Sequence, residues 1–135
     1  MNTEFEVAEL LAEHWRARLD NADDMDLNRD VPTTLHELAT SNFVYRCEMR
    51  EACEQAYIML RTEGIAETVN YCRGRANAAR YRLHQYRVTE IDGVERIGNL
   101  VDTHIAQYTV EAWEMLLSEA GERFRVVAAL SLIHI

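Results

Sequence analysis

Apolar residues recur every three or four positions over most of this chain, and this spacing limits its fold more than any other feature. The first run follows Thr3 and Glu6, which are spaced as a capping box at the start of a helix. It consists of Phe5, Val7, Leu10, Leu11, Trp15 and Leu19. Such spacing puts apolar side chains on one helix face, so we predict a first helix from Thr3 that ends near Leu19.

Two further helices are predicted on either side of Gly64. A second capping box, Thr34 with Glu37, starts a long second helix that runs from about residue 35 to residue 63. Gly64 is suited to end this helix, because glycine adopts the left-handed conformation of a helix C-cap without a steric penalty. A third helix is expected over residues 65–88.

Asp92-Gly93 leaves two interpretations open. As a type I′ turn it would join a β-hairpin and make the fold α+β. As the start of a fourth helix, Asp92 would pair with Glu95 in a capping box. We favour the helix, because the residues that follow keep a three-to-four period for about six turns; they are Val94, Ile97, Val101, Ile105, Tyr108, Ala112 and Met115. The prediction is therefore an all-α, four-helix bundle-like domain, in which Gly121 ends the fourth helix and a short fifth element follows.

This domain is expected to cover residues 1–129. The last six residues, 130–135, read Leu-Ser-Leu-Ile-His-Ile. That string resembles the translation of a transposon-derived sequencing adapter, as found at the edge of a metagenomic contig. We therefore predict that residues 130–135 are a non-native or disordered tail and exclude them from the domain.

The composition points to a cytoplasmic protein without a membrane segment. The longest apolar run, residues 126–130, is far shorter than the ~20 residues that a membrane span requires, and the acidic N-terminus lacks the features of a signal peptide. Three cysteines without a C-x-x-C pair are expected to be buried free thiols in a reducing compartment. The net charge of −9 opposes indiscriminate binding to nucleic acid.

The predicted third helix departs from this acidic average. Five arginines and no acid lie between Arg73 and Arg87, and Gly74 among them suggests a bend or a close helix crossing. At helical spacing one polar stripe forms from Asn70, Arg73, Asn77, Arg80, His84 and Arg87. The arginines could pair with the acidic first and second helices. Alternatively, together with Tyr81, they could bind phosphates and stack on bases.

Two patterns in the sequence raise the hypothesis of a metal site. Oxygen-bearing side chains occupy positions one, three, five and twelve of an EF-hand-like loop, namely Asp26, Asn28, Asp30 and Glu37. However, position six is Val31, and a β-branched residue is unsuited to the positive φ required there. Histidines fall on four predicted helices at His14, His36, His84 and His104, but no Glu-x-x-His or His-Glu-x-x-His motif accompanies them.

These patterns favour a non-enzymatic interaction or regulatory protein that works through helix faces and forms a homo-oligomer. Its partner would be a protein, including a second copy of itself, and the charged surface would contain Arg73, Arg80 and Arg87 with Tyr81 and His84. An alternative is a nucleic-acid-binding subunit that uses the same helix. A further alternative is a metal- or cofactor-binding bundle enzyme, although no catalytic motif is present and no cofactor is predicted.

Overall fold

The computed structural model describes residues 3–23, 43–88 and 97–133 of the chain. These residues form α1 (Thr3–Asp23), α3 (Phe43–Glu63), α4 (Ile65–Val88) and α5 (Ile97–Ile133), and none of them lies in a strand. The predicted all-α, bundle-like fold is confirmed. The described part of the predicted second helix is α3, which begins at Phe43 in the described range.

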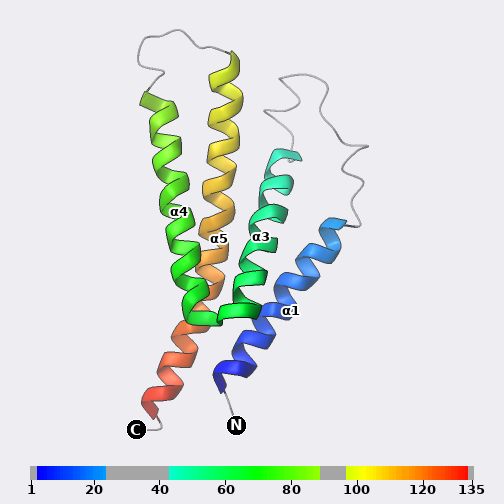
Figure 1. Cartoon of the computed structure of the whole chain (residues 1–135), viewed down its shortest axis with the longest axis vertical. Coiled ribbons are helices and arrows are strands. Elements are labelled where there is room, and N and C mark those ends of the chain that lie inside the picture. The colour runs from blue at the N-terminus through cyan, green and yellow to red at the C-terminus, as the bar shows by residue number, and fades with distance from the viewer. Residues whose placement is uncertain (1–2, 24–42, 89–96, 134–135) are drawn as a thin grey trace.

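Helix α5 is the centre of the bundle. It packs against α1, α3 and α4, and α3 likewise packs against the other three described helices, whereas α1 and α4 each pack against α3 and α5. In Figure 1, α4 lies on one side of α5, and α3 and α1 lie on the other. The main core fills the space between these helices, with Leu11, Trp15, Ile65 and Leu116 fully buried.

A second, smaller core joins α4 to α5 towards the C-terminal end of α4. It consists of Ala79, Leu83, Ala106 and Val110, with Tyr86 packed against it. Because two of these four residues are alanines, the backbones of the two helices can approach closely here. This pairing supports the part of α4 that carries most of the arginines.

The junction between α3 and α4 is a single residue, Gly64, with a φ of 91°. Its N–H donates to the carbonyl of Leu60 at 3.2 Å, and its own carbonyl accepts from the N–H of Thr68 at 3.1 Å. The buried hydroxyl of Thr68 also donates to the Gly64 carbonyl at 2.7 Å. The predicted C-cap at Gly64 is confirmed, because this φ lies in the left-handed region that side chains with a Cβ disfavour.

Three predictions about helix ends and faces are wrong. Gly121 does not end the last helix, because α5 continues through it to Ile133, so no separate element follows Gly121 in the described range. Gly74 marks no close helix crossing, since a Cβ built there would meet nothing within 4 Å. Phe5 and Leu10 were assigned to an apolar face, but each is 60% exposed.

Two sequence-based interpretations fall largely outside the described residues. The turn at Asp92-Gly93 lies between the end of α4 at Val88 and the start of α5 at Ile97, and is not described. Of the tail over residues 130–135, the positions up to Ile133 continue α5.

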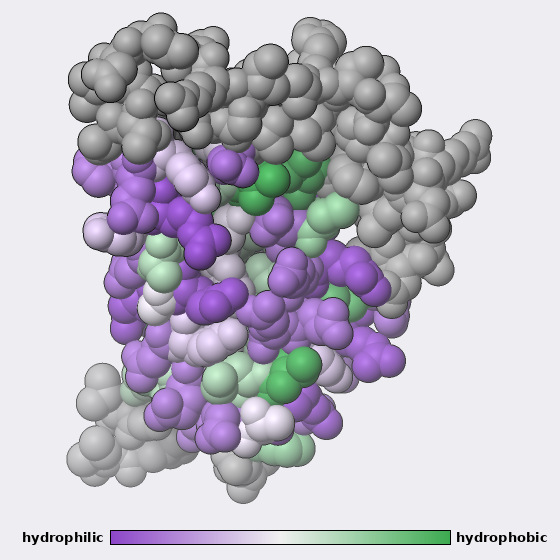
Figure 2. Space-filling view, turned by 45° about the horizontal axis from the view of Figure 1, so that its top comes forward, coloured by the Kyte–Doolittle hydropathy of each residue, from purple (hydrophilic) through white to green (hydrophobic). Residues whose placement is uncertain are grey.

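No helix in the described part of the chain has the length and apolar character needed to cross a membrane. In the view of Figure 2, the described surface is mostly hydrophilic, with apolar side chains scattered across it.

Candidate functional site on helix α4

Helix α4 separates its apolar and polar residues as the periodicity predicted. The buried side contains Val69, Cys72, Ala76, Ala79 and Leu83. Of the predicted site residues, Arg73, Arg80, Tyr81 and His84 are all exposed. Arg87 lies in the last turn of α4, and its side chain is outside the described part of the structure.

Two arginines of the predicted stripe have partners within the chain. Arg80 donates from Nε to Glu114 of α5 at 2.8 Å and from Nη1 to Asn77 at 2.8 Å. Arg73 donates to Asn70 at 3.2 Å. The predicted ion pairing therefore occurs at Arg80, but with α5 and not with the first two helices. Its side chains are 48% and 45% exposed, so solvent screens the pair and it contributes little to stability.

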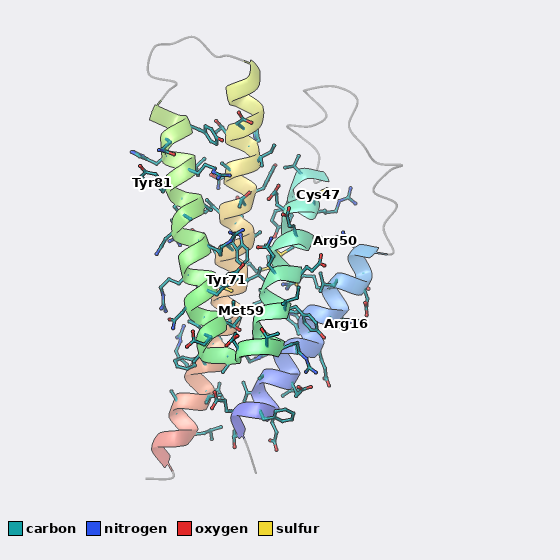
Figure 3. All side chains as sticks on the ribbon, viewed as in Figure 1. Arg16, Cys47, Arg50, Met59, Tyr71 and Tyr81 are labelled. Carbon is teal, nitrogen blue, oxygen red and sulfur yellow. The ribbon has the colours of Figure 1, made fainter. Side chains whose placement is uncertain are left out.

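Tyr81 lies between two flanks of arginine. It is 66% exposed and projects from α4 on the side away from α3 (Figure 3). At helical spacing, Arg73 and Arg80 stand on one side of it and Arg75 and Arg82 on the other. No hydrogen bond, ion pair or ring contact joins Tyr81 or Arg82 to another described residue.

A groove runs along the second of these flanks, between α4 and α5. Its volume is about 290 Å³. Its walls include Arg75, Ala78, Ala79, Arg82 and Tyr86 from α4, and Asp102, Ile105, Ala106, Thr109 and Trp113 from α5. Two arginines therefore border a slot whose lining combines polar and apolar side chains in similar measure.

The guanidinium of Arg75 is held in place at one end of this groove. It lies 5.1 Å from the centroid of the Trp113 ring and donates to Gln55 of α3 at 3.1 Å. Tyr71 completes the support, since its hydroxyl donates to Gln55 at 3.3 Å and its ring meets Trp113 edge-on at 5.7 Å. A cation held over an aromatic face needs little reorganisation before it binds an anion.

Thr109 in the same groove contacts a carboxyl group of α3. Its hydroxyl donates to Glu48 at 2.9 Å. Burial raises the pKa of Glu48, and the nearby charge of Glu51 adds to this, while the hydrogen bond from Thr109 opposes it. Glu48 therefore keeps a proton to a higher pH than an ordinary glutamate.

A separate polar cluster joins α1 to α5 at Glu119. This carboxylate, 22% exposed, accepts hydrogen bonds from His14 at 2.8 Å, from Trp15 at 3.2 Å and from both Nη atoms of Arg18 at 2.8 and 2.7 Å. A carboxylate can only accept, so Nε2 of His14 donates to it, and the 3.3 Å approach of Arg18 to that nitrogen is not a second hydrogen bond.

The surroundings of Glu119 lower its pKa. Burial alone would raise the pKa, but the hydrogen bonds from Arg18, His14 and Trp15 and the charge of Arg18 together outweigh it. With its oxygens occupied by these donors, Glu119 is suited to hold α1 against α5. It is not placed to act as a base.

The cysteines divide into two kinds. Cys53 and Cys72 are buried, and burial raises the pKa of Cys53 to about 11 and that of Cys72 to about 12. Cys47 is partly exposed near the N-terminal end of α3 (Figure 3), and burial also raises its pKa. All three are free thiols, as predicted, but Cys47 is not fully buried.

The metal hypotheses find no site in the described residues. Asp26, Asn28, Asp30, Glu37 and His36 all lie outside them. Within the described ranges, no three His, Cys, Asp or Glu side chains lie close enough together to hold a metal ion. Of the remaining histidines, His14 binds Glu119, His84 is exposed, and His104 stacks on Tyr108 at 6.4 Å.

The arginines of α4 can be recognised from the sequence, whereas the groove and the Glu119 cluster cannot. Arg75 and Arg82 lie outside the predicted polar stripe, and no local pattern pairs them with Trp113, 38 residues away from Arg75 in the chain. Comparisons of the chain with protein-family models, with curated proteins and with solved structures found no match.

Proposed function

We propose that this protein is a non-enzymatic interaction protein whose α4 binds an acidic surface of a protein partner. One observation carries the proposal: Tyr81 is 66% exposed at the centre of a helix face flanked by four arginines. No acidic residue interrupts α4 between Arg73 and Val88.

The residue types support protein recognition. Tyrosine and arginine are over-represented among the residues that dominate binding energy at interfaces. A tyrosine ring supplies a large contact area with few rotatable bonds, and arginine forks match carboxylates in a bidentate way. The acidic character expected of the partner follows from the positive charge of the face.

The same charge pattern bears on the proposed homo-oligomer. A symmetric contact between two α4 faces would bring arginines against arginines, which is unfavourable. Self-association through α4 would therefore join it to an acidic face of the second copy. The exposed glutamates of α1, such as Glu6 and Glu13, provide one.

Photo-crosslinking from α4 would test the proposal. A benzoylphenylalanine residue at Tyr81 is expected to crosslink a protein in cells of the source organism, and the same residue at Glu54, exposed on α3, is expected not to. Arg82→Glu should weaken the crosslink, since it reverses one charge of the face. Equal crosslinking from both positions, or none from position 81, would contradict the proposal.

Nucleic-acid binding is the second candidate, and the exposed ring of Tyr81 beside guanidinium groups favours it. Against it stand the net charge of −9 and the neutralisation of Arg80 by Glu114. Labelled single-stranded RNA and DNA at two salt concentrations distinguish the candidates. Affinity that falls steeply with salt and is lost in Tyr81→Ala would support nucleic acid, whereas no binding at low salt would exclude it.

A further inference from the structure

We propose that the groove between α4 and α5 binds a small organic anion, with a carboxylate or phosphate group attached to a flat apolar body. This site lies on one flank of α4 and does not depend on the proposed protein partner. Its volume of about 290 Å³ is close to the lower limit of typical small-molecule sites.

The two arginines of the groove indicate that the ligand has an anionic group. Arg75 and Arg82 are seven residues apart, so they lie on the same side of α4 at a spacing of about 10 Å. Arg75 is already held over Trp113 by its contacts with that ring and with Gln55. Arg82 has no partner among the described residues. A bound oxyanion would give Arg82 the charge-assisted hydrogen bonds that no described residue gives it.

The residues at the floor and the ends of the groove indicate that the rest of the ligand is flat and apolar. Ala78, Ala79 and Ala106 leave space because their side chains are small, and the aromatic rings of Trp113 and Tyr86 also line the groove. A planar apolar group could lie on such a floor and contact the ring of Tyr86, whereas Trp113 is only 2% exposed and is already covered by Arg75.

Asp102 limits where the oxyanion can sit. Its carboxylate lines the same groove and would repel a negative group. Arg75 of α4 and Trp113 of α5 meet at one end of the groove. Tyr86 is 11 residues from Arg75 on α4, and Asp102 is 11 residues from Trp113 on α5, so both lie towards the other end. The oxyanion is therefore expected between the side chains of Arg75 and Arg82, away from Asp102, with the rest of the ligand extending towards Ala106.

Binding of three matched probes to the full chain would test this site. The probes are 2-naphthoate, 2-naphthyl phosphate and the neutral 2-naphthamide, measured by calorimetry and by the indole N–H signals in a nitrogen–proton correlation spectrum. We expect one or both anions to bind, their relative affinities showing whether carboxylate or phosphate is preferred. The signal of Trp113, assigned with Trp113→Phe, should shift more than that of Trp15, which lies outside the groove.

Variants distinguish binding in the groove from a general attraction between the anion and the positive charges of α4. Arg82→Gln should weaken binding at least about fivefold, from the loss of one charged hydrogen bond. Arg73→Gln removes the same charge from an exposed position outside the groove and should change affinity less than about twofold. Asp102→Asn should tighten binding by a factor of about two to five, because a screened repulsion is removed.

Filling the groove gives a test that does not depend on charge. Ala78 is exposed, so Ala78→Leu should leave the fold intact by circular dichroism and abolish binding of the anions. The proposal is overturned by any of three results: no saturable binding up to about 1 mM probe, equal binding of the neutral amide, or equal losses in Arg82→Gln and Arg73→Gln.

Discussion

The carboxylate of Glu119 gives the sharpest prediction about stability. Glu119→Gln keeps the size of the side chain but removes the charge that Arg18 meets with two hydrogen bonds at 2.7 and 2.8 Å. Hydrogen bonds to charged groups contribute roughly 1.5–3 kcal/mol each when well formed. Because both side chains are about one-quarter exposed and the amide oxygen can still accept, we expect a total loss of about 2 kcal/mol.

Urea unfolding followed by circular dichroism measures this loss, provided that the m-value stays constant. The matched control is Glu114→Gln, since Glu114 also lies on α5 and pairs with an arginine at 2.8 Å but is 45% exposed. It should cost less than about 0.5 kcal/mol. Equal losses in the two variants would refute the argument that burial decides the difference.

The difference in stability between the wild type and Glu119→Gln should also depend on pH. The pKa of Glu119 is lowered in the folded state. The charge of Glu119 therefore makes its full contribution to the free energy of unfolding above the unfolded-state pKa of about 4.3. The contribution disappears as the pH falls through the lower folded-state pKa. The stability difference between the wild type and Glu119→Gln should therefore be constant near neutral pH and shrink below about pH 4. A difference that stayed constant down to pH 2 would contradict this.

Three further predictions concern the backbone, the thiols and the helix junction. Gly74→Ala should stabilise the protein by up to about 1 kcal/mol, because the position is helical and open, whereas Gly64→Ala should destabilise it by at least that amount; thermal unfolding of both would show opposite shifts. Cys47 should react with a thiol reagent in the native state, and the other two cysteines only in denaturant, as counted by mass spectrometry. Thr68→Val should cost about 1 kcal/mol in urea unfolding, since it removes the hydroxyl that donates to Gly64.

Local patterns in the sequence were sufficient to predict most of the helices. Helix α4 has the predicted bounds because Gly64 and the apolar residues that follow it are local signals. The error at Gly121 has a physical reason. Glycine weakens a helix by only about 1 kcal/mol, and burial of Ala120 and Val127 on the main core offsets that cost.

The candidate sites were harder to predict because they depend on contacts between distant residues. Arg75 and Trp113 meet only when α4 packs against α5. The Glu119 cluster left a weak signal, since Arg18 and Glu119 are charged residues close to the buried positions Trp15 and Leu116 on their helices. A charge beside an apolar stripe indicates a buried pair, but the sequence alone does not identify the partner.

The one-residue junction at Gly64 also has a consequence for how the chain folds. Because α3 and α4 are consecutive and joined without a loop, the contacts between them close only short lengths of chain. The entropy lost in bringing them together is correspondingly small. We therefore expect this helical pair to form early in folding, before Arg18 of α1 and Glu119 of α5 meet across 101 residues.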